Sequence, residues 1–226
     1  MASSTIENYL KAILLRSGEP GSMVPTGTIA SALGVVPGTS TTMVKSMAKQ
    51  GLVEYHARTG VRLTAKGRTL ALAVLRKHRL IESFLVQVLK MDWAEVHDEA
   101  EALEHAISDR VLERLDELLG HPIVDPHGDP IPDSQGRLQV RRQLSLSEMP
   151  LNKIAQVSGI ASQTSEMLEL LQYNHIRLGT RLEIRKKFPF DNSLEVKVRN
   201  RPPVTISAQV AKNVLVKDDE SPAERR

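Results

Sequence analysis

The sequence predicts an α+β chain in three parts: an N-terminal winged helix-turn-helix, an all-helical middle domain and a C-terminal small β-barrel. Apolar residues recur at helical spacing through the first half of the chain, a proline-rich stretch at 125–132 ends this pattern, and short alternating segments fill the last third. We place the domains at 1–70, 71–137 and 148–226, with a linker at 138–147.

The first 70 residues carry the pattern of a winged helix. Three helices are expected, with a glycine turn between the second and third, and a short hairpin follows them. The helices span 5–16, 26–33 and 37–50, and the hairpin strands span 52–55 and 61–64. This order is typical of a DNA-binding domain.

Candidate DNA contacts lie on the third helix and on the hairpin, which would form the wing. Small hydroxyl side chains can approach bases and phosphates closely, and basic side chains neutralise phosphates. The predicted contacts are Thr39, Ser40, Thr41, Thr42 and Lys45 on the helix, and Arg58 and Arg62 on the wing. The alternative is that the threonines only cap and solvate a surface helix.

Charge is distributed unevenly along the chain. The net charge is +6 over 1–76, −8 over 77–137 and +5 over 138–226, and five of the seven histidines lie in the acidic segment. A basic first segment suits a polyanion such as DNA, and an acidic, histidine-rich middle segment suits cations.

The middle segment predicts two long helices, from Ala65 to about Lys90 and from Trp93 to Leu119. Thr64 and Asp92 are the expected caps, and Gly120 ends the second helix. Two helices with this much apolar surface cannot bury it alone, so we expect a homodimer through this segment. The inner stripe of the second helix is Ala100, Leu103, Ile107, Val111, Leu115 and Leu118.

Six side chains of these helices could bind metal. His78 and Glu82 lie four residues apart on the first helix, and at about 100° per residue the four candidates on the second helix share one face. Those four are His97, Glu101, Glu104 and His105. Imidazoles and carboxylates on one arc predict a site for one or two divalent cations. The alternative is a solvated charged face. We expect structural roles for His121 and His127, which flank prolines.

The stretches RKHRLIESFLVQVL, EVHDEAEALEHAISD and DPHGDPIP resemble the diphtheria toxin repressor family of metal-dependent regulators, in particular its manganese-responsive branch. The resemblance implies an ancillary site at His78, Glu82 and His97, and a primary site at Glu101, Glu104 and His105. It also implies a primary-site ligand at position 8, which is Asn8 here. At position 11 the manganese branch can carry a glutamate ligand, and this chain has Lys11.

The C-terminal segment predicts strands at 152–157, 181–188, 194–198 and 204–206, with a helix at 165–173. It resembles the SH3-like domain of this family, which implies a weak match of Gln163 and Glu166 to two further ligands of the ancillary site. We expect residues 217–226 to be disordered.

The sequence therefore predicts a repressor activated by Mn²⁺ or Fe²⁺ that binds double-stranded operator DNA as a dimer and controls metal-uptake genes. Cysteine is absent, and no apolar run or signal-peptide core indicates a membrane or export, so we expect a cytoplasmic protein. The basic winged helix, and the lack of a candidate nucleophile or proton shuttle near the metal ligands, indicate that it is not an enzyme. Two alternatives stay open: a helical di-metal hydrolase or oxidase, and a winged-helix regulator that senses an organic ligand.

Overall fold

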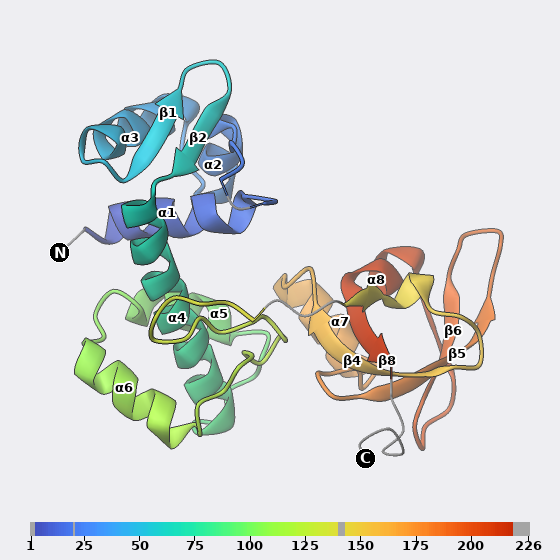
Figure 1. The fold of residues 1–226 in the computed structure, drawn as a ribbon. Coiled ribbons are helices and arrows are strands. Elements are labelled where there is room, and N and C mark those ends of the chain that lie inside the picture. Colours follow the sequence, from blue (N-terminus) through green and yellow to red (C-terminus); the bar gives the residue numbers. More distant parts are fainter. Residues whose placement is uncertain (1–2, 20, 140–142, 219–226) are drawn as a thin grey trace, which may run out of the picture.

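The computed structural model describes residues 3–19, 21–139 and 143–218. The chain forms an N-terminal winged helix, a helical domain below it and a C-terminal sheet domain beside the helical domain (Figure 1). The long helix α4 (Ala65–Gln87) begins in the first domain and crosses into the second. Within the described ranges, no helix is both long and apolar enough to cross a lipid bilayer.

The winged helix forms as the sequence predicts. Its core gathers apolar side chains from all of its elements, including Leu10, Ile29 and Val44, which are fully buried. Ser3 begins the first helix as its N-cap, and its Oγ accepts a hydrogen bond from the Ile6 amide. The elements are α1 (Ser4–Arg16), α2 (Thr26–Ala32), α3 (Pro37–Lys49), β1 (Val53–His56) and β2 (Gly60–Leu63).

The wing is the antiparallel hairpin β1–β2, which is tied back to the helices at one point. Val24 pairs with Val61 of β2 through two backbone hydrogen bonds of 2.8 and 2.9 Å. Gly60, at φ +116°, makes this approach possible, since a Cβ there would lie 2.2 Å from the Val24 carbonyl oxygen. This contact fixes the wing relative to α3.

The predicted single helix from Trp93 to Leu119 is wrong. The structure has two helices, α5 (Val96–Leu103) and α6 (Asp109–Leu118), separated by a turn. Ser108 caps α6, and its Oγ accepts a hydrogen bond from the Val111 amide at 3.3 Å. A serine followed by an aspartate is a strong helix start, so the local capping preference prevails over the continuous apolar spacing.

The apolar stripe predicted for that helix faces two ways. Ala100 is buried against α4 and Ile107 and Leu115 are half-buried, whereas Leu103, Val111 and Leu118 are exposed in the single chain. The exposed fractions are 44% for Leu103, 50% for Val111 and 63% for Leu118. The stripe thus leaves apolar surface on α5 and α6 available for a partner.

The C-terminal domain is a six-stranded antiparallel sheet with strand order β3-β8-β4-β5-β6-β7. Its helix α7 (Ser165–Tyr173) lies at the predicted position, and a second short helix, α8 (Ala208–Asn213), precedes the last strand. The strands are β3 (Leu144–Ser145), β4 (Ile154–Ile160), β5 (Arg181–Lys187), β6 (Leu194–Val198), β7 (Val204–Ile206) and β8 (Val214–Asp218), and the 3₁₀ helix η1 spans Leu146–Glu148.

Two boundaries in this domain differ from prediction. Strand β3 lies inside the segment predicted as linker. This segment forms a strand because it pairs with β8, which is distant in sequence. Strand β8 was not predicted, and it includes residues 217–218 of the supposed disordered tail. The rest of that tail, 219–226, lies outside the described residues.

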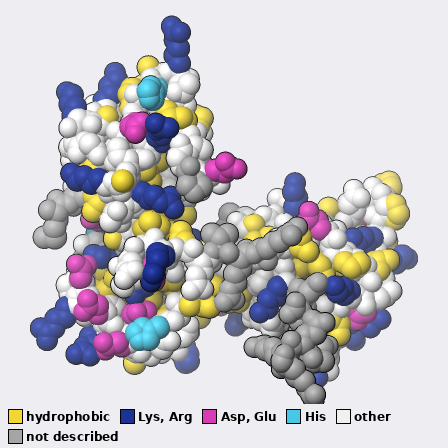
Figure 2. Space-filling view, viewed as in Figure 1, with side chains coloured by type: hydrophobic (Ala, Val, Ile, Leu, Met, Phe, Trp, Pro, Cys, Tyr) yellow, Lys and Arg dark blue, Asp and Glu magenta, His cyan; other side chains and the backbone are white. Residues whose placement is uncertain are grey.

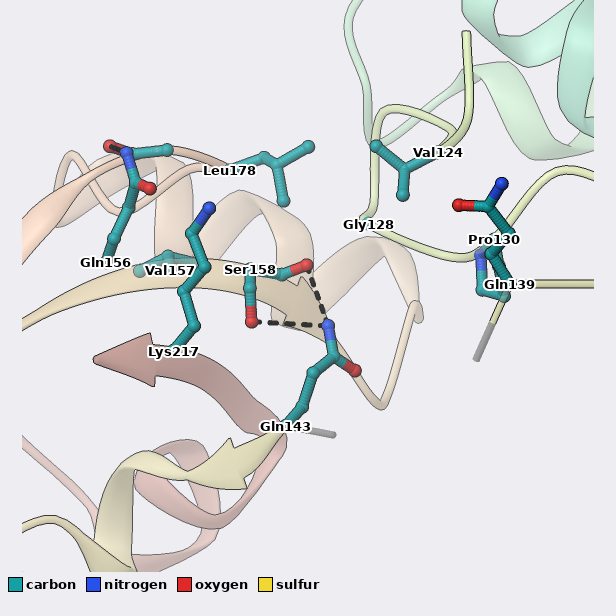
Figure 3. Close-up of a pocket in the computed structure, with 11 residues that line it drawn as sticks. Val124, Gly128, Pro130, Gln139, Gln143, Gln156, Val157, Ser158, Leu178 and Lys217 are labelled. Atoms are coloured by element: carbon teal, nitrogen blue, oxygen red, sulfur yellow. Dashed lines mark hydrogen bonds between the residues drawn. The ribbon is translucent and has the colours of Figure 1, made fainter. Parts of the chain in front are cut away.

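The C-terminal domain docks on the helical domain at Trp93 and at the proline-rich loop of residues 125–132. Trp93 is part of the core of the sheet domain and stacks on His127 with ring centroids 5.7 Å apart. The Ile160 amide donates to the His127 carbonyl oxygen at 2.9 Å. A cavity of about 290 Å³ lies along the same junction, between Val124 and Pro130 on one side and β4 on the other (Figure 3).

Candidate metal centre and nucleic-acid interface

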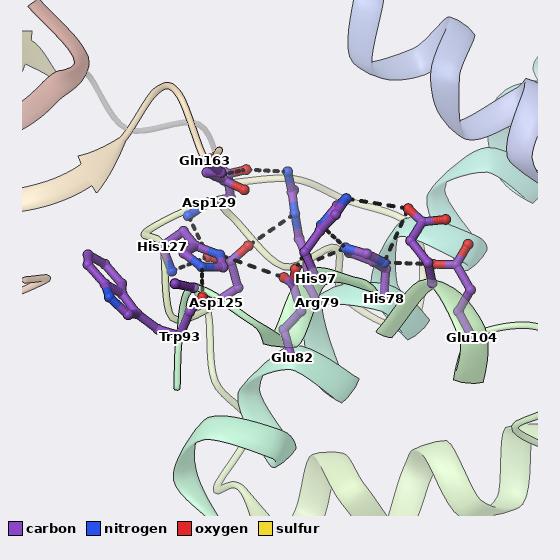
Figure 4. A network of polar contacts seen from close by, with 12 residues as sticks. His78, Arg79, Glu82, Trp93, His97, Glu104, Asp125, His127, Asp129 and Gln163 are labelled. Carbon is purple, nitrogen blue, oxygen red and sulfur yellow. Dashed lines mark hydrogen bonds and ion pairs between the residues drawn. The ribbon is translucent and has the colours of Figure 1, made fainter. Parts of the chain in front are cut away.

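Three of the predicted ligands meet between α4 and α5. The i,i+4 spacing places His78 and Glu82 on one face of α4, and His97 comes from the first turn of α5 (Figure 4). His78 Nε2 lies 3.0 Å from Glu82 Oε1 and 3.2 Å from His97 Nδ1. His97 Nδ1 lies 3.3 Å from Glu82 Oε1.

These three donor atoms fit one divalent ion. Ligand bonds of about 2.1 Å at right angles place neighbouring donors about 3.0 Å apart. The observed separations of 3.0 to 3.3 Å are close to this value. Two imidazole nitrogens and a carboxylate oxygen, with no sulfur, suit Mn²⁺ and Fe²⁺.

The electrostatics of the cluster favour positive charge. Burial alone would lower the pKa of His78, but its hydrogen bonds to the Glu104 and Glu82 carboxylates raise that pKa to about 9. Burial likewise acts to raise the pKa of Glu82, yet hydrogen bonds from His78 and His97 hold it well below its usual range. The carboxylates therefore stay ionised around the site.

A second group of donors adjoins the first, and the sequence analysis missed it. Glu82, Asp125 and His127 are buried, and one ligand atom from each lies within 4.8 Å of the others. Glu82 Oε2 faces His127 Nδ1 at 3.9 Å while its Oε1 faces the first group, so this carboxylate touches both. The signal in the sequence was the DPHGDPIP stretch itself, which was assigned a structural role.

His127 is oriented as a ligand would be. Its Nε2 lies 2.8 Å from the Trp93 carbonyl oxygen, which can only accept, so Nε2 carries the proton. Its Nδ1 is buried without a hydrogen-bond partner and presents a lone pair toward Glu82. Burial and the neighbouring Asp129 and Glu82 raise the pKa of Asp125 to about 8. A cation would satisfy both groups.

Glu101 and Glu104 both contact Lys11, and Glu101 Oε1 also lies 3.7 Å from His97 Nε2 at the edge of the first donor group. The Lys11 ammonium lies 2.7 Å from Glu101 Oε1, and 2.6 and 2.7 Å from the two Glu104 oxygens. Glu104 is fully buried and Lys11 nearly so. Burial opposes ionisation of Glu104, but His78 and Lys11 together lower its pKa. The structure thus places a lysine where the family resemblance implies metal ligands.

Asn8 and His105 form a separate contact. His105 Nε2 donates to Asn8 Oδ1 at 2.7 Å, and His105 Nδ1 lies 2.6 Å from Glu7 Oε2. His105 Nε2 also lies 3.4 Å from Glu104 Oε1. The residues implied for the ancillary site therefore lie together, whereas those implied for the primary site contact Lys11 or one another, with Glu104 between the two sets.

The two weak candidates in the C-terminal domain differ from each other. Gln163 Nε2 donates to Asp129 Oδ2 at 3.1 Å, so this side chain reaches the proline-rich loop beside the second donor group (Figure 4). Glu166 is exposed in the first turn of α7.

Three of the five predicted DNA contacts on α3 are exposed. Thr39, Thr42 and Lys45 face solvent, and Thr41 is half-buried. Ser40 is fully buried, and its Oγ donates to the Thr26 carbonyl oxygen at 3.3 Å. The prediction that Ser40 faces outward is wrong, because its position on α3 packs against α2.

On the wing, Arg58 is exposed at the turn, whereas Arg62 is paired with Glu54 at 2.6 Å across the hairpin. Figure 2 shows Lys and Arg side chains around the winged helix and Asp and Glu side chains over the helical domain. The chain thus combines a winged helix that carries Lys and Arg side chains with a cluster of carboxylates and imidazoles, and the long helix α4 joins the two. This combination is that of a metal-responsive DNA-binding regulator.

Comparison with known proteins gives the family. The iron-dependent repressor N-terminal DNA-binding domain matches residues 1–61, the iron-dependent repressor metal binding and dimerisation domain matches 64–133, and the FeoA domain matches 144–218. The diphtheria toxin repressor of Corynebacterium efficiens is 34% identical over 190 residues, covering 80% of this chain and 82% of that protein. The iron-dependent repressor IdeR of Mycobacterium tuberculosis is 41% identical over 128 residues, covering 57% and 55%.

Among solved structures, a manganese-dependent transcriptional repressor in complex with manganese superposes with a TM-score of 0.84 at 35% identity, covering 94% of this chain and 99% of that one. The chain belongs to the iron-dependent repressor family, which includes the diphtheria toxin repressors. It is a metal-dependent transcriptional repressor, so the alternative of a hydrolase or oxidase is wrong.

Proposed function

We propose that this chain is a repressor activated by Mn²⁺ or Fe²⁺ that binds operator DNA as a homodimer and controls metal-uptake genes. The observation that carries the proposal is the triangle of His78 Nε2, Glu82 Oε1 and His97 Nδ1, with sides of 3.0 to 3.3 Å. A regulator of this kind acts where the chromosome lies, in the cytoplasm.

His78, Glu82 and His97 would hold a first ion, and Glu82, Asp125 and His127 would hold a second. Glu82 belongs to both groups, because its Oε1 faces the first group and its Oε2 faces His127. An ion in these positions would supply positive charge between α4, α5 and the proline-rich loop. Gln163 steadies this loop from the C-terminal domain through Asp129.

The dimer forms through the exposed stripe of Leu103, Val111 and Leu118. Two winged helices are then presented by two copies of α4, which matches the two-fold symmetry of most operators. His78 and Glu82 lie on the helix α4 that carries the winged helix, so an ion held there would favour one arrangement of α4 and α5. If that arrangement is the one that binds DNA, binding of the ion and binding of DNA would each raise the affinity for the other.

The test is DNA affinity measured by fluorescence anisotropy, with a duplex first selected from a random-sequence pool in the presence of Mn²⁺. We expect Mn²⁺ or Fe²⁺ to tighten binding, and Mg²⁺ at the same concentration to do so far less. A variant carrying His78→Ala and His97→Ala should lose this response. His121→Ala is the matched control, since His121 is exposed and pairs with Asp116, which belongs to neither donor group.

An unchanged Mn²⁺ response in the double variant would refute the assignment of the ion site. DNA binding that is indifferent to every metal but changes with an organic compound would support a ligand-sensing regulator, with the cavity of Figure 3 as its site.

A further inference from the structure

Lys11 is a side-chain cation that this chain places among the groups which the family resemblance implies for the primary metal site. Its side chain leaves α1, in the winged helix, and ends among carboxylates of the α5 region. Only 6% of the residue is exposed, and Glu104 is not exposed at all. Buried lysines are rare and costly unless they are paired, so this arrangement replaces lost hydration with direct contacts.

The ammonium is fully coordinated by these contacts. It has three protons to donate, and its neighbours are Glu101 Oε1, both oxygens of Glu104 and, at 3.5 Å, His78 Nδ1. The distances of 2.6 to 2.7 Å are those of strong charge-assisted hydrogen bonds. A divalent ion bound by Glu101 and Glu104 would have to displace Nζ or lie against a like charge.

The remaining residues of that set are also satisfied without a metal. Asn8 Oδ1 and Glu7 Oε2 both contact the His105 ring, at 2.7 and 2.6 Å. By contrast, the Nδ1 of His127 in the second donor group is buried without a partner. Arg79 also pairs with Asp125 of this second group, at 3.5 Å, but it leaves the His127 Nδ1 free to bind an ion.

We propose that Lys11 is a built-in cation that takes the position of a metal ion between α1 and the α5 region. It ties the winged helix to the helical domain at all metal concentrations. Metal ions are then confined to the group of His78, Glu82 and His97 and to the group of Glu82, Asp125 and His127. This inference rests on the proposed function, because it states which part of the site the activating ion occupies.

The experiment counts bound ions without DNA. The purified full chain is dialysed against Mn²⁺, and the Mn²⁺ bound per subunit is measured by elemental analysis and by native mass spectrometry. Lys11→Glu and Lys11→Gln remove the built-in cation, Lys11→Arg keeps the charge, and Lys49→Gln is the control at an exposed lysine on α3. Glu104→Gln in the parent chain tests whether the carboxylate partner of Lys11 is itself a metal ligand.

We expect Lys11→Glu to bind one more Mn²⁺ per subunit than the parent, and Lys11→Gln to do the same with weaker affinity. Lys11→Arg and Lys49→Gln should bind the parental number, and so should Glu104→Gln, since no ion depends on Glu104. Circular dichroism in the presence of Mn²⁺ shows whether each variant is folded.

Loss of an ion in Glu104→Gln would overturn the inference, because Glu104 would then be a ligand in the parent. A folded Lys11→Glu that gains no ion would overturn it as well. Failure of the proposed function looks different: the parent would bind no Mn²⁺, or would lose none in the double variant at His78 and His97.

Discussion

Replacing Lys11 with methionine should destabilise the protein far more than a surface substitution does. The change keeps most of the side-chain volume and removes the ammonium, which leaves Glu104 buried beside the imidazoles of His78 and His105. Breaking a buried ion pair from one side costs about 3–5 kcal/mol. Glu101 adds little to this figure, because its side chain is 35% exposed and solvent screens it.

The assay is urea unfolding followed by tryptophan fluorescence. Trp93 is the single tryptophan of the chain, and it lies close to α5 at the junction with the C-terminal domain. We expect the free energy of unfolding of Lys11→Met to fall by about 3–5 kcal/mol. For a chain of this size, that corresponds to a melting temperature lower by about 6–20 °C. Lys49→Met, at an exposed position, should change stability by less than about 0.5 kcal/mol.

Added Mn²⁺ should restore part of the loss. With the ammonium gone, Glu101 and Glu104 are free to bind an ion, and a ligand at about 100 times its dissociation constant stabilises the folded state by about 2.7 kcal/mol. The Mn²⁺-dependent gain should therefore be larger in Lys11→Met than in the parent. A loss no larger than that of Lys49→Met, or an equal Mn²⁺ gain in both proteins, would refute the reasoning.

Three further predictions concern the other surfaces. Gly128→Ala should release the C-terminal domain from the helical domain, because the new Cβ would lie 2.3 Å from the Ser158 carbonyl oxygen; the release is measured as faster proteolysis near residue 140. Gly136→Ala is the control: Gly136 also has a positive φ, but its Cβ would meet a leucine side chain at 3.5 Å, so the domain should stay docked. Leu118→Glu should abolish the dimer in sedimentation analysis. The free energy of unfolding of the protomer should hardly change, since the Leu118 side chain is exposed in the single chain. A dimer that persists in this variant would show that the interface lies elsewhere. Arg58→Ala should reduce the slope of log DNA affinity against log salt concentration by the equivalent of about one phosphate contact. Arg62→Ala should reduce the slope less, because the Arg62 side chain is paired with Glu54. Equal slopes in the parent and both variants would show that the wing does not reach DNA.

Periodicity alone located most of the helices and strands. The spacing of Leu10 and Ile13 predicted α1, and the alternation at 52–55 and 61–64 predicted the wing, because a local pattern specifies which face an element buries. The pairing of His78 with Glu82 also follows from sequence, since residues four apart on a helix meet. Strand β8 escaped prediction because its burial depends on β3 and β4, both more than fifty residues earlier.

The composition of the two donor groups could not be predicted from sequence spacing. Asp125 and His127 join Glu82 only because the proline-rich loop folds back over α4, and nothing in their local pattern distinguishes a ligand from a loop residue. The contacts of Lys11 with Glu101 and Glu104 span 90 and 93 residues. Ser40 lies among exposed threonines in sequence and is still buried, because α2 covers that side of α3.

The sequence by itself determined the three domains, the helix faces and the supply of imidazoles and carboxylates in the acidic middle segment. Only the tertiary structure decided which of these groups face one another and which face a lysine. The physical reason is that helix and strand periodicities are set by neighbouring residues, whereas the neutralisation of a buried charge is set by whatever cation the packing brings to it.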